Sequence, residues 1–299
     1  MKDYIIRKKI NKSFKYYDKN NNILSKNKID KYLDFYIPPG YNDVKINKTK
    51  GKIRAIGYDD KNRPQYIYNK KYTEKQSTIK FNKLINFGKN YKQIRDKILK
   101  DLNSISETKE KQIATILMLI IECDFRIGND KYAKENNSYG VTTLEKRHLK
   151  TTNGQFKIDF IGKKGIRNRC VLKNKNVIKN LKTKKRTIKK NDRIFTYRKN
   201  NKYYDIKSND VNNYIKKLGN WSSKYFRTWS ANISLISKLN SGLSLKESIE
   251  KTADKLHHTP AICKKNYLDS KLIKFYEKNQ KKFLEYFKGD KNEKYYKFI

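Results

Sequence analysis

The spacing of hydrophobic positions changes near residue 74. Before it, short runs of β-branched and aromatic residues are separated by turn-forming residues, and three of the four prolines lie there. Such runs predict β-strands. After it come long periodic stretches with hardly any proline, which predict helices. We therefore expect an α+β protein with a small β-rich N-terminal domain, 1–74, and a larger, mainly helical domain, 75–299. The strands expected in the first domain are 32–36, 44–46, 53–58 and 65–68.

A nearly continuous apolar stretch, 113–121, marks the centre of the second domain. Ser104, with Glu107 three residues later, forms a capping-box pattern in front of it, which predicts that a helix begins there. The segment is apolar almost all round and reaches Asp124. We therefore expect a helix that is buried on every side and forms the axis of this domain.

The rest of the second domain alternates a hairpin with further helices. Residues 155–161 and 169–172 are expected to pair as two strands, because glycines stand at both edges of the turn between them. The basic run 182–190 fits a nuclear address or a phosphate contact, but such runs are more often solvated loops. Helices are expected at 205–218, at 223–239 and over most of 244–288.

Composition adds a large positive charge to this organisation. The 299 residues include 73 Lys and Arg against 29 Asp and Glu, a formal charge of +44. A charge of this size attracts polyanions, and the interleaving of Lys with Tyr, as in 66–72, suits phosphate contacts. Nucleic acid is therefore the favoured partner, and an anionic membrane surface is a weaker second. Codons rich in A and T also explain part of the excess of lysine. Hydrophobic residues are only 36%, but 23 Tyr and 13 Phe can build a core.

Several classes of protein fit the sequence poorly. No apolar run is long enough to cross a bilayer, and the N-terminus lacks the apolar stretch of a signal peptide. Cys123, Cys170 and Cys263 are scattered and odd in number, so we expect neither a disulfide framework nor a zinc site, in a reducing compartment. With three histidines, no CxxC or HExxH pattern and no Gly-rich phosphate loop, we expect an activity that needs no metal, no ATP and no other cofactor.

Cleavage of a nucleic acid without metal needs a nucleophilic side chain, fixed cations to bear the charge on phosphorus, and an acid for the leaving oxygen. The C-terminal part offers a nucleophile. Pro260 suits the first turn of a helix capped by Thr259, which puts His258 just before that helix and Tyr267 nine residues after His258. Taken alone, this is equally a His at a helix start and one Tyr among 23.

Three cations complete the candidate set. Arg126 follows the buried helix, so the core would hold it and aim it outward, although a helix-terminal Arg is also common. Arg227 lies among aromatic residues in an amphipathic helix, where simple packing on the rings is the ordinary explanation. Lys163 lies in the hairpin turn, where a solvated lysine is equally ordinary. Each is weak alone, and their order along the chain makes the combined signal strong.

The order Arg–Lys–Arg–His–Tyr resembles the type IB DNA topoisomerases, specifically the short poxvirus-like enzymes of large DNA viruses. The resemblance covers nearly the whole chain. It implies a β-rich N-terminal domain and a catalytic domain of the type shared by tyrosine recombinases and type IB topoisomerases. The motifs that carry it are 37–44, 65–68, Phe125-Arg126-Ile127-Gly128, 131–136, Phe160-Ile161-Gly162-Lys163, 224–228 and His258-Thr259-Pro260 through Tyr267.

The resemblance also implies a role for each candidate. Tyr267 would attack a phosphodiester and become linked to the 3′-phosphate, the free strand would swivel, and reversal of the attack would reseal it. Arg126, Arg227 and His258 would bind the non-bridging oxygens, and Lys163 would protonate the departing 5′-oxygen. No nucleotide is needed, because the phosphotyrosyl ester keeps the bond energy.

Further residues would contact DNA by the same resemblance. The implied partner is double-stranded DNA, clamped by a monomer. On the strand 65–68, Tyr66 and Tyr68 are expected to point one way and Ile67 inward. The expected localisation is the virion or a cytoplasmic viral factory, or the nucleus. The residues expected at DNA are Gln65, Tyr66, Tyr68, Lys131 and Tyr132.

Two alternatives stay open at this point. A tyrosine recombinase shares the fold and the nucleophile, but recombinases usually carry His three residues before the second Arg, where this chain has Lys224. The Pro38-Pro39-Gly40-Tyr41 motif and the β-rich N-terminus also favour a topoisomerase. A non-enzymatic basic packaging protein would explain the charge without any tyrosine chemistry.

Overall fold

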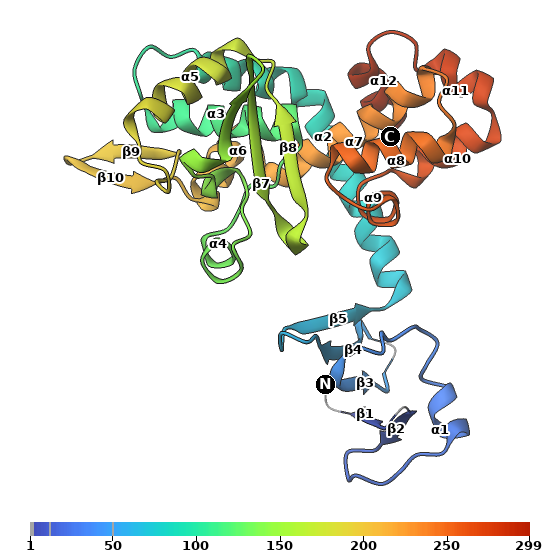
Figure 1. Cartoon of the computed structure of the whole chain (residues 1–299). Helices are drawn as coiled ribbons and strands as arrows, with labels where there is room; N and C mark the ends of the chain where they lie inside the picture. Colours follow the sequence, from blue (N-terminus) through green and yellow to red (C-terminus); the bar gives the residue numbers. More distant parts are fainter. Residues whose placement is uncertain (1–2, 12, 50) are drawn as a thin grey trace. The chain divides into compact units, whose positions relative to one another are not determined.

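The computed structural model describes residues 3–11, 13–49 and 51–299. Its contacts divide the chain into two units, Met1–Lys80 and Phe81–Ile299. The division falls within the long helix α2 (Lys70–Leu102), which also contains the boundary expected from the sequence (Figure 1). Each unit has a hydrophobic core of its own. A small antiparallel β-rich unit is thus followed by a larger, mostly helical one, which confirms the expected fold class.

The first unit is built on a five-stranded antiparallel sheet with the strand order β2-β1-β3-β4-β5. Alternate residues of its strands point to a small core made by Ile5, Ile37, Val44, Ile46 and Ala55. A short helix, α1 (Lys26–Asp30), precedes the loop that leads to β3. The strands are β1 (Tyr4–Ile10), β2 (Ser13–Tyr17), β3 (Asn42–Asn47), β4 (Ile53–Tyr58) and β5 (Pro64–Tyr68).

The sequence predicted three of these strands and one that does not exist. The segment 32–36 forms no strand. The guanidinium of Arg54 donates to the carbonyl of Tyr32 at 3.0 Å and to the carboxylate of Asp34 at 2.7 Å. The Tyr32 carbonyl, which a sheet would use, is therefore held by a side chain, and two prolines follow after Ile37. Strands β1 and β2 went unpredicted because lysines obscure their alternation.

One buried arginine orders the Pro-Pro-Gly-Tyr loop of the first unit. The Arg7 side chain is almost fully buried and donates to the carbonyls of Ile37 at 3.2 Å, Pro38 at 2.9 Å and Tyr41 at 2.9 Å. Because prolines cannot donate hydrogen bonds of their own, these charge-assisted bonds fix a loop that has few backbone partners.

Helix α3 (Lys109–Cys123) forms the axis of the second unit, as its apolar sequence predicted. Every residue from 112 to 120 is buried, and the helix packs against α5, α6, α7 and β9. The predicted start is wrong. Ser104 lies just after the end of α2, and the helix is capped instead by Thr108, whose hydroxyl accepts from the amide of Lys111. The four-residue capping pattern occurs by chance in the connection between two helices.

In the second unit, the three-stranded sheet and the helices α5 to α7 lie close to this axis, whereas the helices after α7 gather to one side of it (Figure 1). The predicted hairpin and helices are confirmed, and the hairpin gains a third strand. The basic run 182–190 is not a loop in its first part, because α5 extends to Thr187 and its lysines cover the helix surface. The elements are α4 (Asp130–Asn136), β6 (Leu149–Thr152), β7 (Gln155–Ile161), β8 (Arg167–Val171), α5 (Lys175–Thr187), β9 (Thr196–Lys199), β10 (Lys202–Asp205), α6 (Ser208–Leu218), α7 (Ser223–Asn240), α8 (Leu245–Lys255), α9 (Pro260–Asn266), α10 (Ser270–Lys278), α11 (Gln280–Tyr286) and α12 (Lys291–Phe298).

Two of the three cysteines are joined by a disulfide, which corrects the expectation from their scatter. Cys123, the last residue of α3, is bonded to Cys170 on β8. They are 47 residues apart in sequence, but the fold brings their Cα atoms to 5.7 Å. Cys263 is buried and has a free thiol. The bond therefore ties the end of the buried helix to the three-stranded sheet.

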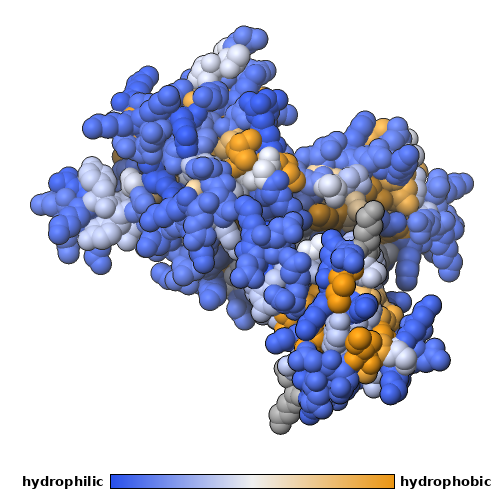
Figure 2. All heavy atoms as spheres, turned by 60° about the horizontal axis from the view of Figure 1, so that its bottom comes forward, coloured by the Kyte–Doolittle hydropathy of each residue, from blue (hydrophilic) through white to orange (hydrophobic). Residues whose placement is uncertain are grey.

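The surface agrees with the composition. The face seen in Figure 2 is hydrophilic over most of its area, with small hydrophobic patches. Among the helices of the described residues, none has the length and apolar character needed to span a membrane. Lysines and other polar side chains therefore cover much of the visible surface, while the apolar residues fill the two cores.

A single glycine in α2 tests the packing of the second core. A Cβ atom added at Gly88 would lie 2.3 Å from the Trp229 ring. We expect Gly88→Ala to lower the free energy of unfolding by about 1–3 kcal/mol, since this overpacking outweighs the helix-propensity gain of about 1 kcal/mol. Chemical denaturation followed by circular dichroism measures the change, and Lys89→Ala, at the exposed neighbouring position, serves as the control. Unchanged or increased stability in Gly88→Ala would contradict this packing.

Candidate active site

Arg126 is held by the sharp end of the buried helix α3. Asp124 ends the helix in the left-handed conformation, with φ of 52°, and Phe125 packs edge-on against Phe160 with ring centres 4.9 Å apart. The carbonyl of Arg126 accepts from the amide of Val141 at 2.9 Å. The backbone of Arg126 is thus fixed on both sides, while its side chain stays only partly buried.

The short helix α9 brings Tyr267 back to His258. Thr259 caps the helix through its hydroxyl and Pro260 occupies the first turn, as the sequence predicted. His258 Nε2 lies 3.1 Å from the hydroxyl of Tyr267. The same nitrogen lies 2.6 Å from Nη2 of Arg126, a residue 132 positions earlier in the chain. A guanidinium, an imidazole and a phenol therefore form one continuous chain of contacts.

Arg227 reaches the same tyrosine from helix α7. Its side chain is almost fully buried, Nη2 donates to the carbonyl of Leu256 at 3.0 Å, and its guanidinium carbon lies 5.6 Å from the centre of the Tyr267 ring. Its Nη1 is buried with no hydrogen-bond partner among the described residues. A buried donor without a partner is costly, so this nitrogen is available to an anion that enters the site.

Lys163 lies at the edge of this group. It is exposed in the tight turn Lys163–Gly165 between β7 and β8, where Lys164 adopts the left-handed conformation, with φ of 65°. Its charge contributes to the low pKa of His258, so it lies within electrostatic reach of the imidazole. The structure thus brings together Arg126, Arg227, His258 and Tyr267, with Lys163 beside them.

The electrostatics of the site favour a bound anion. Burial, followed by the charges of Arg126 and Arg227, lowers the pKa of His258 to about 3. Burial and the neighbouring charge of Arg227 also lower the pKa of Arg126, partly offset by Tyr267. The imidazole is therefore neutral near pH 7, and two guanidinium groups repel one another across it. A phosphate between them would relieve both the repulsion and the missing hydrogen bond.

Asn232 holds the backbone at Tyr267 and was missed by the sequence reasoning. It is fully buried in α7, its amide group donates to the carbonyl of Tyr267 at 2.9 Å, and its side-chain oxygen accepts from the amide of Asp269 at 2.8 Å. The sequence signal was an asparagine among apolar residues of an amphipathic helix. Such a residue often satisfies buried backbone groups of a neighbouring segment.

The predicted DNA-contact residues of the first unit lie on β5. Tyr66 and Tyr68 are exposed on one face and stack at 6.2 Å, and Tyr68 also stacks on Tyr72 at 5.7 Å. Ile67 packs against the core, so the predicted alternation is confirmed. Gln65 lies on the other face and its amide donates to Asp59 at 3.0 Å, which leaves it less free to contact a ligand.

The other two predicted contact residues lie on α4 in the second unit. Asn129 caps this helix by accepting from the amide of Tyr132. The side chains of Lys131 and Tyr132 are both exposed. The helix begins four residues after Arg126, so these side chains follow the candidate catalytic group closely along the chain.

Comparison with known proteins decides the family. The family model of the eukaryotic DNA topoisomerase I catalytic core matches residues 69–293. This chain belongs to the type IB DNA topoisomerases. It is 30% identical to DNA topoisomerase 1B of Acanthamoeba polyphaga mimivirus over 309 residues, which cover 96% of this chain and 91% of that protein. It is 26% identical to DNA topoisomerase 1B of Vaccinia virus (strain Copenhagen), over 78% of this chain and 75% of that protein.

A cellular relative extends the comparison beyond viruses. DNA topoisomerase 1 of Mycosarcoma maydis is 31% identical over 172 residues, which cover 52% of this chain and 17% of that longer protein. The type IB topoisomerases are isomerases that act on DNA, and the chain is accordingly an enzyme of this class. Neither the tyrosine recombinase nor the non-enzymatic packaging protein is favoured by these comparisons.

The three histidines of the enzyme provide a direct test of the site electrostatics. Burial is the main cause that lowers the pKa of His148 and His257 to about 4 and of His258 to about 3. In the DNA-free protein we expect their ring resonances to stay constant from about pH 7 to about pH 5, below the ordinary value of about 6.5. Two-dimensional NMR of the imidazole groups measures this, with His258→Asn to assign one signal.

The same pKa shifts predict the direction in which stability changes with pH. The unfolded chain takes up protons at its histidines near pH 6.5, whereas the folded protein does not until about pH 4 or 3. The free energy of unfolding is therefore expected to fall as the pH is lowered through this interval, and to be largest above it. A histidine that titrates near pH 6.5 in the folded protein would contradict the buried, neutral imidazoles.

Proposed function

We propose that this enzyme relaxes supercoiled duplex DNA by cutting and resealing one strand through Tyr267. The observation that carries the proposal is the 3.1 Å contact between the Tyr267 hydroxyl and His258, itself 2.6 Å from Arg126. A phenol surrounded by two guanidinium groups and an imidazole suits nucleophilic attack on a phosphodiester. Membership of the type IB family supports the same chemistry.

The covalent step exchanges one phosphoester for another. The Tyr267 oxygen forms a bond to phosphorus, the bond to the 5′-oxygen breaks, and the strand remains attached through its 3′-phosphate. The nearby positive charges stabilise the negative charge that develops on the Tyr267 oxygen as it loses its proton to water and attacks. Reversal by the free 5′-hydroxyl reseals the strand. The bond energy is kept in the phosphotyrosyl ester, so the reaction needs no ATP.

Arg126, Arg227 and His258 bind the non-bridging oxygens of the phosphate in this proposal. The buried Nη1 of Arg227, which has no partner among the described residues, supports the assignment, because the charged oxygen of the transition state would satisfy it. The repulsion between the two guanidinium groups, which adds to burial in lowering the pKa of Arg126, supports it as well. The negative charge of a bound phosphate would raise the pKa of His258. The imidazole would then carry more positive charge when it donates a hydrogen bond to the phosphate.

Lys163 is the acid that protonates the departing 5′-oxygen. Its exposed place in the β7–β8 turn, together with its electrostatic influence on His258, supports this role. General acid catalysis by a positioned side chain typically accelerates such a step by ~10² to ~10⁴-fold. The acid is needed because an alkoxide is a poor leaving group.

The proposed partner is double-stranded DNA, bound by one copy of the chain. The exposed Tyr66 and Tyr68 in the first unit, and Lys131 and Tyr132 in the second, are proposed to contact its backbone. Lysines and phenols are both suited to phosphate oxygens, and the charge of +44 adds a long-range attraction. We also propose that the enzyme acts in a virion, a cytoplasmic viral factory or the nucleus.

Replacement of the proposed nucleophile tests the function. We expect Tyr267→Phe to form no covalent adduct with a duplex and to lose relaxation of supercoiled plasmid in the presence of EDTA and without ATP. The substitution removes one hydroxyl contact and costs about 1 kcal/mol of stability, so the protein should remain folded. Denaturing gels of labelled duplex measure the adduct. The control is Tyr203→Phe, an exposed tyrosine. An adduct in Tyr267→Phe would remove the nucleophile assignment.

A modified leaving group tests the acid. We expect Lys163→Ala to slow single-turnover cleavage of ordinary DNA by ~10² to ~10⁴-fold. A duplex with sulfur at the 5′-bridging position should restore most of the rate, because a thiol, with a pKa of about 8.5, leaves without a proton. Lys164→Ala, which changes the next residue of the same turn, should affect neither substrate. Equal losses on both substrates in Lys163→Ala would deny the lysine its role.

A further inference from the structure

Two chain segments pair side by side behind the candidate site. Asp124 forms an ion pair with Lys255, with Oδ2 and Nζ 3.1 Å apart. The His257 ring packs on Phe125, with ring centres 5.5 Å apart. Arg126 and His258 then meet at 2.6 Å. These three contacts follow one another along the segments 124–126 and 255–258. The alignment set by the Asp124–Lys255 contact therefore also determines where Arg126 meets His258.

Asp124 is an unusual residue to find at this place. Its side chain is fully buried, and this burial raises the pKa of the carboxyl group against the opposing charges of Lys255 and Arg227. Burying a carboxylate costs several kcal/mol unless a cation and hydrogen bonds compensate it. Neither the helix end nor the core requires an acid there, because asparagine also adopts the left-handed conformation.

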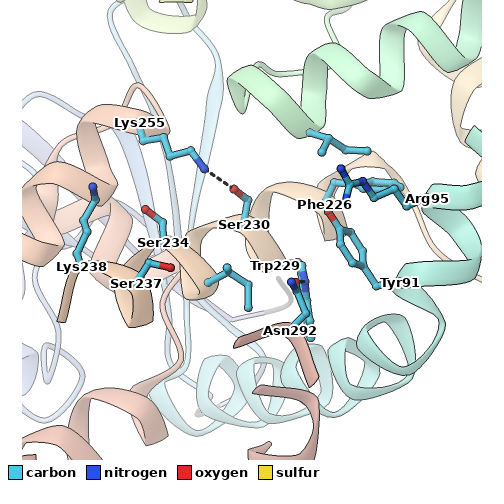
Figure 3. Close-up of a pocket in the computed structure, with 12 residues that line it drawn as sticks. Tyr91, Arg95, Phe226, Trp229, Ser230, Ser234, Ser237, Lys238, Lys255 and Asn292 are labelled. Atoms are coloured by element: carbon cyan, nitrogen blue, oxygen red, sulfur yellow. Dashed lines mark hydrogen bonds between the residues drawn. The ribbon is translucent and has the colours of Figure 1, made fainter. Parts of the chain in front are cut away.

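Lys255 connects this carboxylate to a third segment. Its ammonium donates to the hydroxyl of Ser230 at 3.0 Å, as Figure 3 shows, and Ser230 lies on α7 about one turn after Arg227. The Lys255 side chain remains 42% exposed, beside a pocket of about 460 Å³ that Ser234 and Lys238 also line. The lysine thus keeps part of its hydration, while the acid does not.

The Asp124–Lys255 ion pair and the Lys255–Ser230 hydrogen bond therefore join the three chain segments that carry the candidate phosphate ligands. Asp124 lies two residues before Arg126, Ser230 lies three residues after Arg227, and Lys255 lies three residues before His258. Without DNA, Arg126 and Arg227 repel one another, and this repulsion adds to burial in lowering the pKa of Arg126. A negative charge buried behind Arg227 opposes this repulsion.

We propose that Asp124 and Lys255 are positioning residues of the cleavage reaction. Their ion pair, extended to Ser230, sets the spacing of Arg126, Arg227 and His258 before DNA binds. The inference rests on the proposed function of these three side chains and assigns a purpose to an acid that contacts none of the reacting atoms. The reaction rate falls steeply when preorganised donors are displaced by a small distance. A break in this link should therefore slow the chemistry more than it weakens DNA binding.

The isosteric variant Asp124→Asn is the principal test. Its control is Asp254→Asn, which removes the same charge from an exposed position next to Lys255. At a temperature where circular dichroism shows both variants folded, we expect Asp124→Asn to lower the single-turnover rate of adduct formation at saturating DNA by about tenfold to a hundredfold. DNA affinity, measured with a duplex under the same conditions, should not weaken, because the change removes a negative charge.

A spectroscopic readout separates positioning from general destabilisation. In DNA-free protein, the His258 ring resonances should shift in Asp124→Asn and stay in place in Asp254→Asn, since the Arg126–His258 contact depends on the pair behind it. A rate for Asp124→Asn equal to that of Asp254→Asn, or a loss that follows only the unfolded fraction, overturns the proposal. An unchanged His258 signal in Asp124→Asn overturns it as well, and this readout does not require DNA cleavage.

Removal of the other partner tests whether the two residues act together. Lys255→Met keeps the aliphatic stem, and Lys251→Met, one turn earlier in α8 and exposed, is its control. If the residues act as a pair, the double variant Asp124→Asn/Lys255→Met should be no slower than the slower single variant. Losses that multiply in the double variant would overturn the joint role. Failure of the proposed function has a different signature, the absence of any Tyr267 adduct in the wild-type enzyme.

Discussion

The candidate site depends on one constraint, which is that two guanidinium groups must be held close to one neutral imidazole. Arg126 contacts the His258 ring and Arg227 lies beside the Tyr267 ring. Burial, together with the charge of Arg227, lowers the pKa of Arg126. Such an arrangement is unfavourable without an anion, and the rest of the fold must hold it together. A phosphodiester would supply the negative charge that balances the two guanidinium groups, so the site is complementary to such a ligand.

The second unit supplies the force that opposes this repulsion. Its axis, α3, is buried over most of its length, and Arg126 lies three residues after its last residue, Cys123. Arg227 comes from α7, which packs on α3, and is anchored by a bond to the carbonyl of Leu256. The cations thus stand at the ends or on the faces of rigid elements, where small displacements are resisted by the hydrophobic core.

Around the nucleophile, polar contacts hold chain segments in a register that apolar packing alone does not define. Asn232 ties the backbone on both sides of the Tyr267 carbonyl to α7, and the Asp124–Lys255 pair ties the end of α3 to the end of α8. Asn232 and Asp124 are buried polar groups with defined partners, and such groups fix the register of segments that hydrophobic contacts alone would leave undetermined.

Local patterns in the sequence determined much of this protein. Alternation predicted β4, β5 and the β7–β8 hairpin, helical periodicity predicted α6 and α7, and the cap at Thr259 predicted the start of α9. These succeed because each depends on residues within a few positions of one another. Tertiary structure decided the rest. Arg54 binds the Tyr32 carbonyl, and the segment 32–36 forms no strand. Cys123 is bonded to Cys170, and Arg126 contacts His258, which lies 132 positions later in the chain. Contacts of this kind depend on how the whole core packs, and no local spacing encodes that packing.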